Sequence, residues 1–333
     1  MDSIPNQQHA WVNLRRGEPA EALEYRADWP VSKNLEPGEA LVKVHAAALN
    51  PAGYKLMKFL PNFVANRPLG DQVFGWVRSD HMRLTNQGAL CQYAKVREDW
   101  IAYAPSNIPL DEVAGFAIVG ITAHDMTVKN ADLQAGQRIF VNGGSTSVGA
   151  IAIQIAKSRG VHVTASASAK NEAFVRRQGA DEFVDYTTVS LPEFLWQRAE
   201  EGRKFDYIFE MAGVTDPSMY TQSDSYLSPM GFYATVGPQP KGLYLSEIWN
   251  LMKTTLFWHL PRVLGGPKAP FKLVCLDYQR EDLEQLQRYI SEGAVKPIVD
   301  STYNFKDTLQ AYERLMNGKI AGKVIVKVNI EDN

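Results

Sequence analysis

The first third of the chain alternates short apolar runs with turn residues. Residues 39–49 form an apolar run that follows Pro37-Gly38, and residues 72–77 and 90–96 form two more, separated by polar positions. A Pro-Gly pair before an apolar, β-branched run indicates a turn that leads into a strand. Short strands with frequent turns predict an antiparallel, barrel-like domain here.

The pattern changes after Pro109. Residues 110–124 are apolar at helical intervals, and from Gly136 strand-like segments alternate with amphipathic ones. The expected strands are residues 139–141, 161–163, 183–184, 207–209 and 232–235, and the helices include residues 171–178, 191–201 and one whose apolar stripe is Val148, Ile151, Ala152 and Ile155. This alternation predicts a parallel, doubly wound sheet with helices on both faces.

The last part of the chain predicts helices at residues 281–291 and 305–316 and strands at residues 295–299 and 322–328. Before it, residues 244–264 contain Trp249, Phe257 and Trp258 among several leucines. This segment predicts a helix rich in aromatic residues, and such a composition is most typical of a helix packed in the core. A wall for a long acyl chain, a partner surface and attachment to a membrane surface remain alternatives.

Composition and charge narrow the class of protein. The length of 333 residues predicts two domains. The chain carries 35 basic and 37 acidic side chains, and this formal charge of −2 disfavours nucleic acid as a partner. Two cysteines, Cys91 and Cys275, exclude a disulfide framework and a four-thiolate metal site. We expect no membrane span and a cytoplasmic location, because no apolar run is long enough and the first residues do not form a signal peptide.

A glycine-rich loop at residues 140–149 lies at a predicted strand-to-helix junction. Gly143 and Gly144 permit a tight turn, and Gly149 allows close packing of the helix. Ser145, Thr146 and Ser147 add hydroxyl groups to a helix N-terminus, which suits a pyrophosphate. The strict G-x-G-x-x-G spacing is absent, so a glycine-rich turn without a ligand remains the alternative.

The end of the next strand indicates which cofactor the loop binds. In NAD-binding folds a carboxylate about 20 residues past the loop accepts hydrogen bonds from the ribose. Residues 163–171 contain serines and Lys170, and the first carboxylate is Glu172. Hydroxyls and an ammonium favour a 2′-phosphate, so the sequence predicts NADPH. A solvated serine-rich loop is the alternative.

Several ordered segments resemble the medium-chain dehydrogenase/reductase superfamily, in its zinc-independent quinone oxidoreductase and enoyl reductase branch. They are Leu49-Asn50-Pro51 followed by Lys55, Gly88-Ala89, Gly120-Ile121-Thr122-Ala123, the loop of residues 143–149, Ile153-Gln154-Ile155-Ala156-Lys157, Gly179-Ala180-Asp181-Glu182, Val184-Asp185-Tyr186 and Gly322-Lys323-Val324-Ile325-Val326. Gly143-Gly144-Ser145-Thr146 and Ser168-Ala169-Lys170-Asn171 look most like fungal trans-acting enoyl reductases that work with polyketide synthases.

The resemblance implies an α/β fold in which a GroES-like β-barrel catalytic domain, residues 1–118 plus 272–333, is interrupted by a Rossmann NADPH-binding domain, residues 119–271. It implies cofactor contacts from Asn50, Lys55, Ser145, Thr146, Ser147, Val148, Ser168, Lys170, Asn171, Tyr186, Val236 and Gly237. Gly120, Ile121, Thr122 and Ala123 would open a helix beside the substrate. A small-molecule or acyl-carrier-bound substrate and a polyketide synthase partner follow from the same resemblance.

Without a metal or an obvious nucleophile, the expected chemistry is hydride transfer from NADPH to the β-carbon of an α,β-unsaturated thioester or ketone, or to a quinone. Lys55, Tyr54 and Thr122 are the candidate donors to the developing enolate. Lys55 and Tyr54 could equally form a salt bridge and a packing contact.

We expect no metal. Zinc-dependent relatives carry a cysteine ligand just after the strand that ends near Leu49, and this chain has Asn50-Pro51-Ala52-Gly53 there. His45, His81 and His124 are conceivable ligands, although isolated histidines are usually surface or core residues.

One segment departs from the family pattern. Residues 66–68 run directly into residues 69–75, where relatives have roughly a β-hairpin more. Gly53 also replaces an Asp that is common in relatives. The catalytic barrel is therefore shortened near residues 68–70, which supports a second hypothesis, a catalytically weak or inactive NADPH-binding homologue. A non-enzymatic scaffold is the third.

Overall fold

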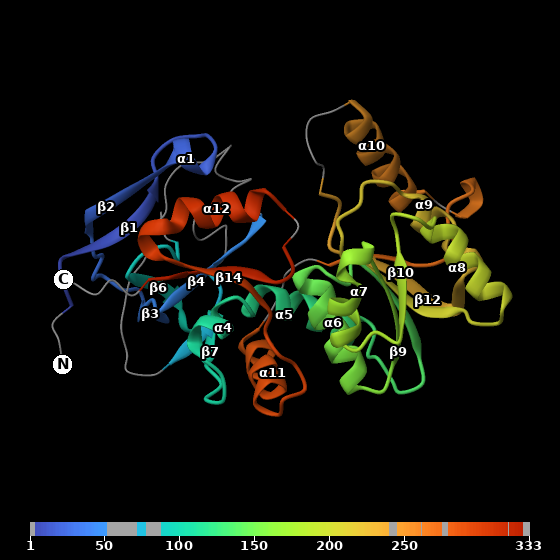
Figure 1. Cartoon of the computed structure of the whole chain (residues 1–333), viewed down its shortest axis with the longest axis horizontal. Coiled ribbons are helices and arrows are strands. Elements are labelled where there is room, and N and C mark those ends of the chain that lie inside the picture. Colours follow the sequence, from blue (N-terminus) through green and yellow to red (C-terminus); the bar gives the residue numbers. More distant parts are fainter. Residues whose placement is uncertain are drawn as a thin grey trace. The chain divides into compact units, whose positions relative to one another are not determined.

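The computed structural model describes residues 4–51, 72–77, 88–239, 245–260, 262–274, 279–318 and 320–328. The chain divides into two compact units (Figure 1). Unit 1 contains residues 1–118 and 278–333, and unit 2 contains residues 119–277. In the described part of the chain, no helix is long and apolar enough to cross a membrane.

Unit 2 is built on a parallel sheet of six strands. In spatial order these are β10 (Glu182–Asp185), β9 (His162–Ala167), β8 (Arg138–Asn142), β11 (Phe205–Glu210), β12 (Leu227–Thr235) and β13 (Phe271–Leu273). Every neighbouring pair is parallel. From β8 the chain adds β9 and β10 on one side, and β11, β12 and β13 lie on the other side. This is the doubly wound arrangement, so the predicted fold class is confirmed here.

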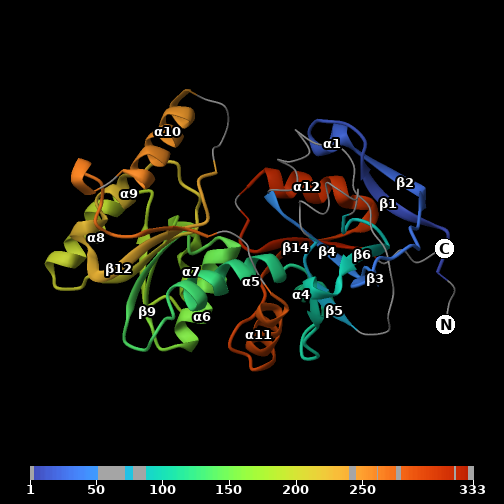
Figure 2. The ribbon, with the colours of Figure 1, turned by 180° about the vertical axis from the view of Figure 1, so that it is seen from behind.

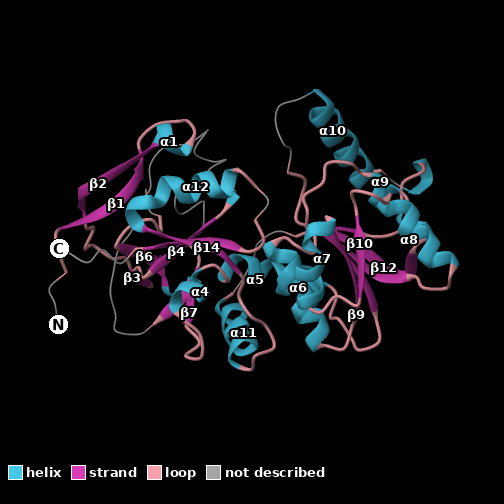
Figure 3. Ribbon diagram, viewed as in Figure 1, coloured by secondary structure: helices cyan, strands magenta, loops and turns pink. Residues whose placement is uncertain are grey.

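Helices connect and cover these strands. They are α6 (Ser147–Ser158), α7 (Glu172–Arg177), α8 (Leu191–Glu200), α9 (Ser218–Thr221) and α10 (Leu245–His259), with short turns η3 (Ala169–Asn171), η4 (Ser223–Ser225) and η5 (Arg262–Leu264). α6 and α7 pack on β8, β9 and β10 (Figure 3). The predicted stripe explains this for α6, because Ile151 and Ile155 are almost fully buried.

A second apolar cluster covers one face of the same sheet. Phe140, Phe205 and Ile208 of the strands pack with Leu195 of α8 and Tyr220 of α9. The sheet is therefore covered by helices, as strands with nearly continuous apolar sequence require.

In the described part of unit 1, the strands form four small sheets. β1 (Gln7–Asn13) pairs with β2 (Leu23–Pro30), β3 (Glu39–Lys43) with β6 (Tyr93–Arg97), β5 (Val73–Gly75) with β7 (Ile101–Tyr103), and β15 (Lys323–Lys327) lies between β14 (Val299–Asn304) and β4 (Ala46–Leu49). The helices are α1 (Pro19–Ala22), α4 (Leu110–Ala114), α11 (Arg280–Ser291) and α12 (Thr308–Met316), with turns η1 (Glu98–Trp100) and η6 (Phe305–Asp307). α5 (Ala117–His124), which continues into the π-helical turn η2 (Asp125–Asn130), carries the boundary between the units. Figure 2 shows these elements from behind.

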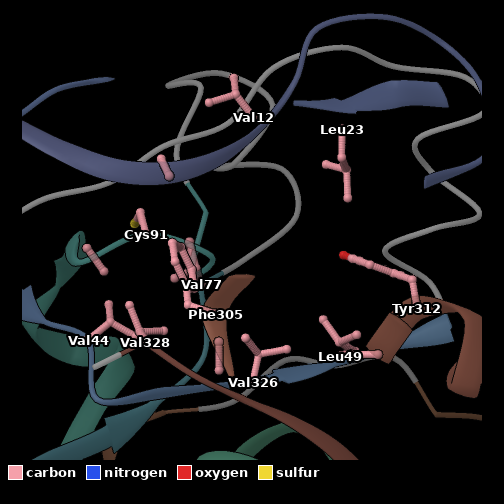
Figure 4. Packing of buried hydrophobic residues seen from close by; sticks show 14 of the residues in the cluster. Val12, Leu23, Val44, Leu49, Val77, Cys91, Phe305, Tyr312, Val326 and Val328 are labelled. Carbon is pink, nitrogen blue, oxygen red and sulfur yellow. The ribbon is translucent and has the colours of Figure 1, made fainter. Parts of the chain in front are cut away.

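The core of unit 1 is built from both ends of the chain (Figure 4). Val12 and Leu23 of the first hairpin belong to the same cluster as Val326 of β15 and Tyr312 of α12. Trp11 adds a hydrogen bond of 2.7 Å from its Nε1 to the carbonyl oxygen of Phe305. Unit 1 therefore forms only when the two ends of the chain meet.

Three expected elements differ in the structure. The run at residues 39–49 is two strands, because the chain changes partner at Val44 and His45: β3 pairs with β6, and β4 pairs with β15. The expected helix at residues 110–124 is divided at Gly115, where an added Cβ would lie 2.9 Å from the Cβ of Lys323. β15 thus approaches the backbone at this break.

The expected strand at residues 295–299 is wrong, since β14 begins only at Val299. The apolar Val295 instead lies just after α11, and its N–H donates to the carbonyl oxygen of Tyr289 at 3.1 Å. β1 and β2 were not expected from the sequence.

Candidate functional site

The strand order of unit 2 locates a candidate ligand site. β8 and β11 are neighbours, and the connections from them run to opposite sides of the sheet. In open α/β sheets, ligands bind at the carboxyl ends of the strands where the order reverses. The loops at that edge are residues 143–146 after β8, residues 211–214 after β11 and residues 236–237 after β12.

The glycine loop after β8 has the geometry of an anion site. Gly143 has φ +85°, and a Cβ there would lie 2.9 Å from the backbone nitrogen of Ala212. A Cβ on Gly149 would lie 2.2 Å from the carbonyl oxygen of Gly143. Only glycine therefore permits this close packing of turn, helix and neighbouring loop, and a pyrophosphate could approach the backbone here.

The start of α6 is capped by the loop itself. The hydroxyl oxygen of Thr146 accepts a hydrogen bond of 3.0 Å from the backbone N–H of Gly149. Thr146, Ser145, Ser147 and Val148 are all half-buried at this helix end. The other N–H groups of a first helical turn lack intrahelical partners, so this end suits a negatively charged ligand.

A buried polar network connects the strand ends below these loops. The hydroxyl of Ser166 donates to the Oδ1 of Asn142 at 2.6 Å, and the Nδ2 of Asn142 donates to the Oε1 of Glu210 at 3.3 Å. The hydroxyl of Thr235 donates to the Oε2 of Glu210 at 2.9 Å. The backbone N–H groups of Ala212 and Gly213 donate to Oε1 at 2.8 and 2.9 Å.

Glu210 is the centre of this network and is 1% exposed. Burial raises the pKa of its carboxyl group, while the hydrogen bonds from Thr235 and the loop backbone oppose that shift. Our sequence analysis missed Glu210 and Asn142. The sequence did contain an indication of their role, since each is a polar residue directly after two or more apolar residues at the end of a strand.

The residues predicted to hold a 2′-phosphate come together at the ends of β9 and β10. Ser168 precedes η3, and its Oγ accepts a hydrogen bond from the Nδ2 of Asn171 at 3.4 Å. Lys170 is exposed in this turn. The backbone N–H of Tyr186 donates to the carbonyl oxygen of Ala167 at 3.3 Å, and the Tyr186 side chain is 53% exposed.

One carboxylate at this turn, Asp185, was noted in the sequence only within a family motif and was assigned no role. Asp185, at the end of β10, accepts hydrogen bonds from the backbone and hydroxyl of Thr187 and from the N–H of Ala169, which lower its pKa. Asp185 ends β10, whereas the carboxylate expected in NAD-binding folds lies at the end of β9, the first strand after the glycine loop. The carboxylate therefore stays ionised next to the turn that carries Lys170.

In unit 1, Asn50 follows β4 and meets a buried lysine. The Nζ of Lys323 donates a hydrogen bond to the Oδ1 of Asn50. Lys323 is 5% exposed, and burial lowers its pKa to about 8. Our sequence analysis noted Lys323 only within a family motif and assigned it no role.

Unit 1 also contains a cavity of about 420 Å³. Its lining includes Asn50 and His45 together with residues of β3, β4, β5, β7 and α4. This volume is in the range of small-molecule sites.

The remaining predicted site residues are placed as follows. Tyr54 and Lys55 lie outside the described residues, as do residues 66–70, where the family pattern fails. Gly120, Ile121, Thr122 and Ala123 do not open a helix as expected, because α5 already begins at Ala117 and they form its second half. The Thr122 side chain is largely buried there. Val236 and Gly237 follow β12, where the Gly237 N–H donates to the Oγ1 of Thr235 at 3.0 Å.

Within the described ranges, no group of three or more His, Cys, Asp or Glu side chains could hold a metal ion. His45 is bonded through Nε2 to the Oδ1 of Asp111 at 2.8 Å, and His124 is buried. His81 lies outside those ranges.

The fold combines a unit of small sheets with a doubly wound unit that has a candidate ligand site at its strand edge. Known proteins with similar sequences and folds are oxidoreductases. A family described as zinc-binding dehydrogenase matches residues 178–326. A zinc-type alcohol dehydrogenase-like protein of Schizosaccharomyces pombe is 30% identical, with 96% of each chain covered. A trans-enoyl reductase of Aspergillus terreus is 31% identical, with 98% of each chain covered. A quinone oxidoreductase structure from Coxiella burnetii superimposes with a TM-score of 0.74 at 22% identity, covering 97% of this chain and 99% of that one.

The chain belongs to the medium-chain dehydrogenase/reductase superfamily. The predicted fold class, a GroES-like unit with a Rossmann unit, is thereby confirmed. The family description mentions zinc, but the side chains that we can place do not offer a ligand set for it.

Proposed function

We propose that this protein is an NADPH-dependent reductase that transfers hydride to an activated C=C bond of an enoyl thioester or enone, or to a quinone. The observation that carries the proposal is the pairing of the glycine loop with the turn after β9. The loop ends at the capped N-terminus of α6, and the turn presents Ser168, Lys170 and Asn171. These groups favour a dinucleotide with a 2′-phosphate.

The proposed binding roles follow from position. Ser145, Thr146, Ser147 and Val148 hold the pyrophosphate at the start of α6. The 2′-phosphate is surrounded by Ser168, Lys170, Asn171 and Tyr186. Val236 and Gly237 line the nicotinamide, and Asn50 and Lys55 lie beside it. When bound, the cofactor supplies the hydride.

The proposed chemistry needs hydrogen-bond donors at the acceptor's carbonyl oxygen. We assign this role to Lys55, Tyr54 and Thr122, because negative charge develops on that oxygen as hydride reaches the β-carbon. Residues 120–123 contribute to the substrate site. No step requires a metal ion.

The family supports an acyl substrate. The Aspergillus terreus relative is named a trans-enoyl reductase. We propose that the substrate is a small molecule or an acyl chain on a carrier, supplied by a polyketide synthase of fungal secondary metabolism.

The test is NADPH oxidation by the purified protein with a panel of enoyl thioesters, enones and quinones, with NADH in parallel. Turnover with NADPH supports the proposal. Binding of NADPH without turnover of any acceptor identifies the weak or inactive homologue instead. Failure of the protein to bind NADPH in a thermal-shift titration overturns the cofactor assignment.

A further inference from the structure

Glu210 makes more contacts than the end of a strand requires. Its side-chain oxygens accept hydrogen bonds from β8 through Asn142, from β12 through Thr235, and from the backbone of its own following loop. Its backbone oxygen accepts the N–H of Val236 at 3.1 Å. One buried residue thus connects the end of β8, the loop after β11 and the end of β12, at the edge where the strand order reverses.

We infer that Glu210 is a positioning residue for the nicotinamide cofactor, which holds these loops in place and supplies a fixed negative charge beneath them. This inference rests on the proposed function, because it assumes that a nicotinamide cofactor binds at this edge. It assigns no chemical step to Glu210.

Several hydrogen-bond donors face the carboxyl group of Glu210 and stabilise its ionised form against the effect of burial. The contacting groups are two amides of the loop backbone, the side-chain amide nitrogen of Asn142 and the hydroxyl of Thr235, and each one donates. A carboxylate accepts all of these bonds. The Oγ1 of Thr235 also accepts the N–H of Gly237, so this hydroxyl joins Glu210 to the loop after β12.

Two consequences follow for cofactor binding. The first is mechanical: without the carboxylate, the N–H groups of residues 212 and 213 lose their partner, and the loop against Gly143 moves. The second is electrostatic: the oxidised nicotinamide ring is a cation and the reduced ring is neutral, so a buried anion near the ring favours the oxidised form. The phosphates are the same in both forms, so their repulsion cancels in a comparison.

The same strand offers a matched control. Asp206, near the start of β11, accepts a hydrogen bond from the backbone N–H of Arg138 of β8 at 2.8 Å and one from the hydroxyl of Ser228 of β12 at 3.2 Å. It therefore connects the same three strands with the same chemistry, but at their amino ends. Its loss should affect stability and leave cofactor binding unchanged.

The experiment measures the Kd of NADP⁺ and of NADPH, together with Tm, for wild type, Glu210→Gln and Asp206→Asn. We expect Glu210→Gln to weaken both complexes and to weaken NADP⁺ roughly threefold to tenfold more than NADPH. Asp206→Asn should lower Tm and keep both Kd values. An equal loss for the two cofactor forms, or the same loss in both variants, shows a purely structural role and overturns the inference.

A second variant covers the case in which Glu210→Gln does not fold. Thr235→Val has nearly the same shape, keeps the charge of Glu210 and removes one donor and the acceptor for Gly237. We expect weaker binding of both forms with an unchanged ratio, and unchanged binding overturns the positioning role. If wild type binds neither form, the proposed function fails as well, whereas binding by wild type with normal Glu210→Gln and Thr235→Val variants contradicts this inference alone.

Discussion

The ammonium group of Lys323 donates a hydrogen bond to the side-chain oxygen of Asn50, which is 273 residues earlier in the chain. Lys323 is 5% exposed and burial lowers its pKa to about 8. Among the described residues, its ammonium group donates to this neutral amide. A buried cation with such a partner is costly, because an amide oxygen compensates only part of the lost hydration.

The first prediction concerns stability against pH. The pKa of Lys323 is about 8 in the folded chain and 10.5 in the reference state, so the unfolded chain binds more protons between these values. Stability contributed by this residue therefore rises with pH across that window. The free energy of unfolding of wild type should rise relative to Lys323→Met by up to about 3 kcal/mol, measured by urea titration from pH 7 to pH 10.

The control for this experiment is Lys204→Met, at an exposed position before β11. Its profile should run parallel to that of wild type. A difference between wild type and Lys323→Met that stays constant with pH would contradict the burial of a charged lysine.

The second prediction tests the 2′-phosphate site. Lys170→Glu reverses an exposed charge beside the proposed phosphate and should weaken NADPH binding roughly tenfold to a hundredfold, with NADH changed by less than about twofold. Isothermal titration with both cofactors measures this. Lys204→Glu makes the same charge change at the opposite end of the sheet and should affect neither cofactor. Equal losses for NADPH and NADH would refute the phosphate assignment.

The third prediction compares two glycines with similar backbones. Gly143 and Gly202 have φ +85° and +76°, but a Cβ on Gly202 meets no atom within 4 Å. Gly202→Ala should therefore cost about 1 kcal/mol from backbone strain and leave NADPH binding intact. Gly143→Ala should cost more and reduce NADPH affinity, because its Cβ collides with the loop at Ala212. Equal stability and affinity in the two variants would show that the loop can move aside.

The fourth prediction separates the two faces of α10. Trp258 stacks on Phe271 of β13 with ring centroids 4.3 Å apart, whereas Trp249 is 57% exposed. Trp258→Ala should lower the free energy of unfolding by about 2 kcal/mol. Trp249→Ala should stay within about 0.5 kcal/mol of wild type. Chemical denaturation of both variants provides the test, and similar losses would mean that α10 packs differently.

This helix also shows what the sequence could decide. Its existence was predicted, and core packing is correct for Trp258 but not for the exposed face that contains Trp249, Met252 and Leu256. The aromatic content of a helix does not determine which side meets the core, since that depends on where the partner strand lies. The pocket wall and the partner surface stay predictions.

The parallel sheet of unit 2 was predictable because its strands are buried on both faces and its helices have a regular apolar period. β14 and β1 were not, because their sequences are polar at many positions and become strands only through pairing. β14 is held by β15, and β1 by β2.

The residues of the candidate site also divide into those that the sequence predicts and those that it does not. The glycine loop was visible because its conformation depends on adjacent residues. Glu210 and Lys323 were not recognised, because their partners come from other strands and a lone charge in a sequence is usually solvated.

Unit 1 is formed by two separate parts of the chain, and this has a consequence for its folding during synthesis. β4, the strand directly before Asn50, pairs with β15, and all of unit 2 lies between them in the chain. On the ribosome, unit 2 is complete before β15 emerges, while β4 still lacks its neighbour. The Asn50 amide therefore acquires its lysine partner only after the whole Rossmann unit has been synthesised.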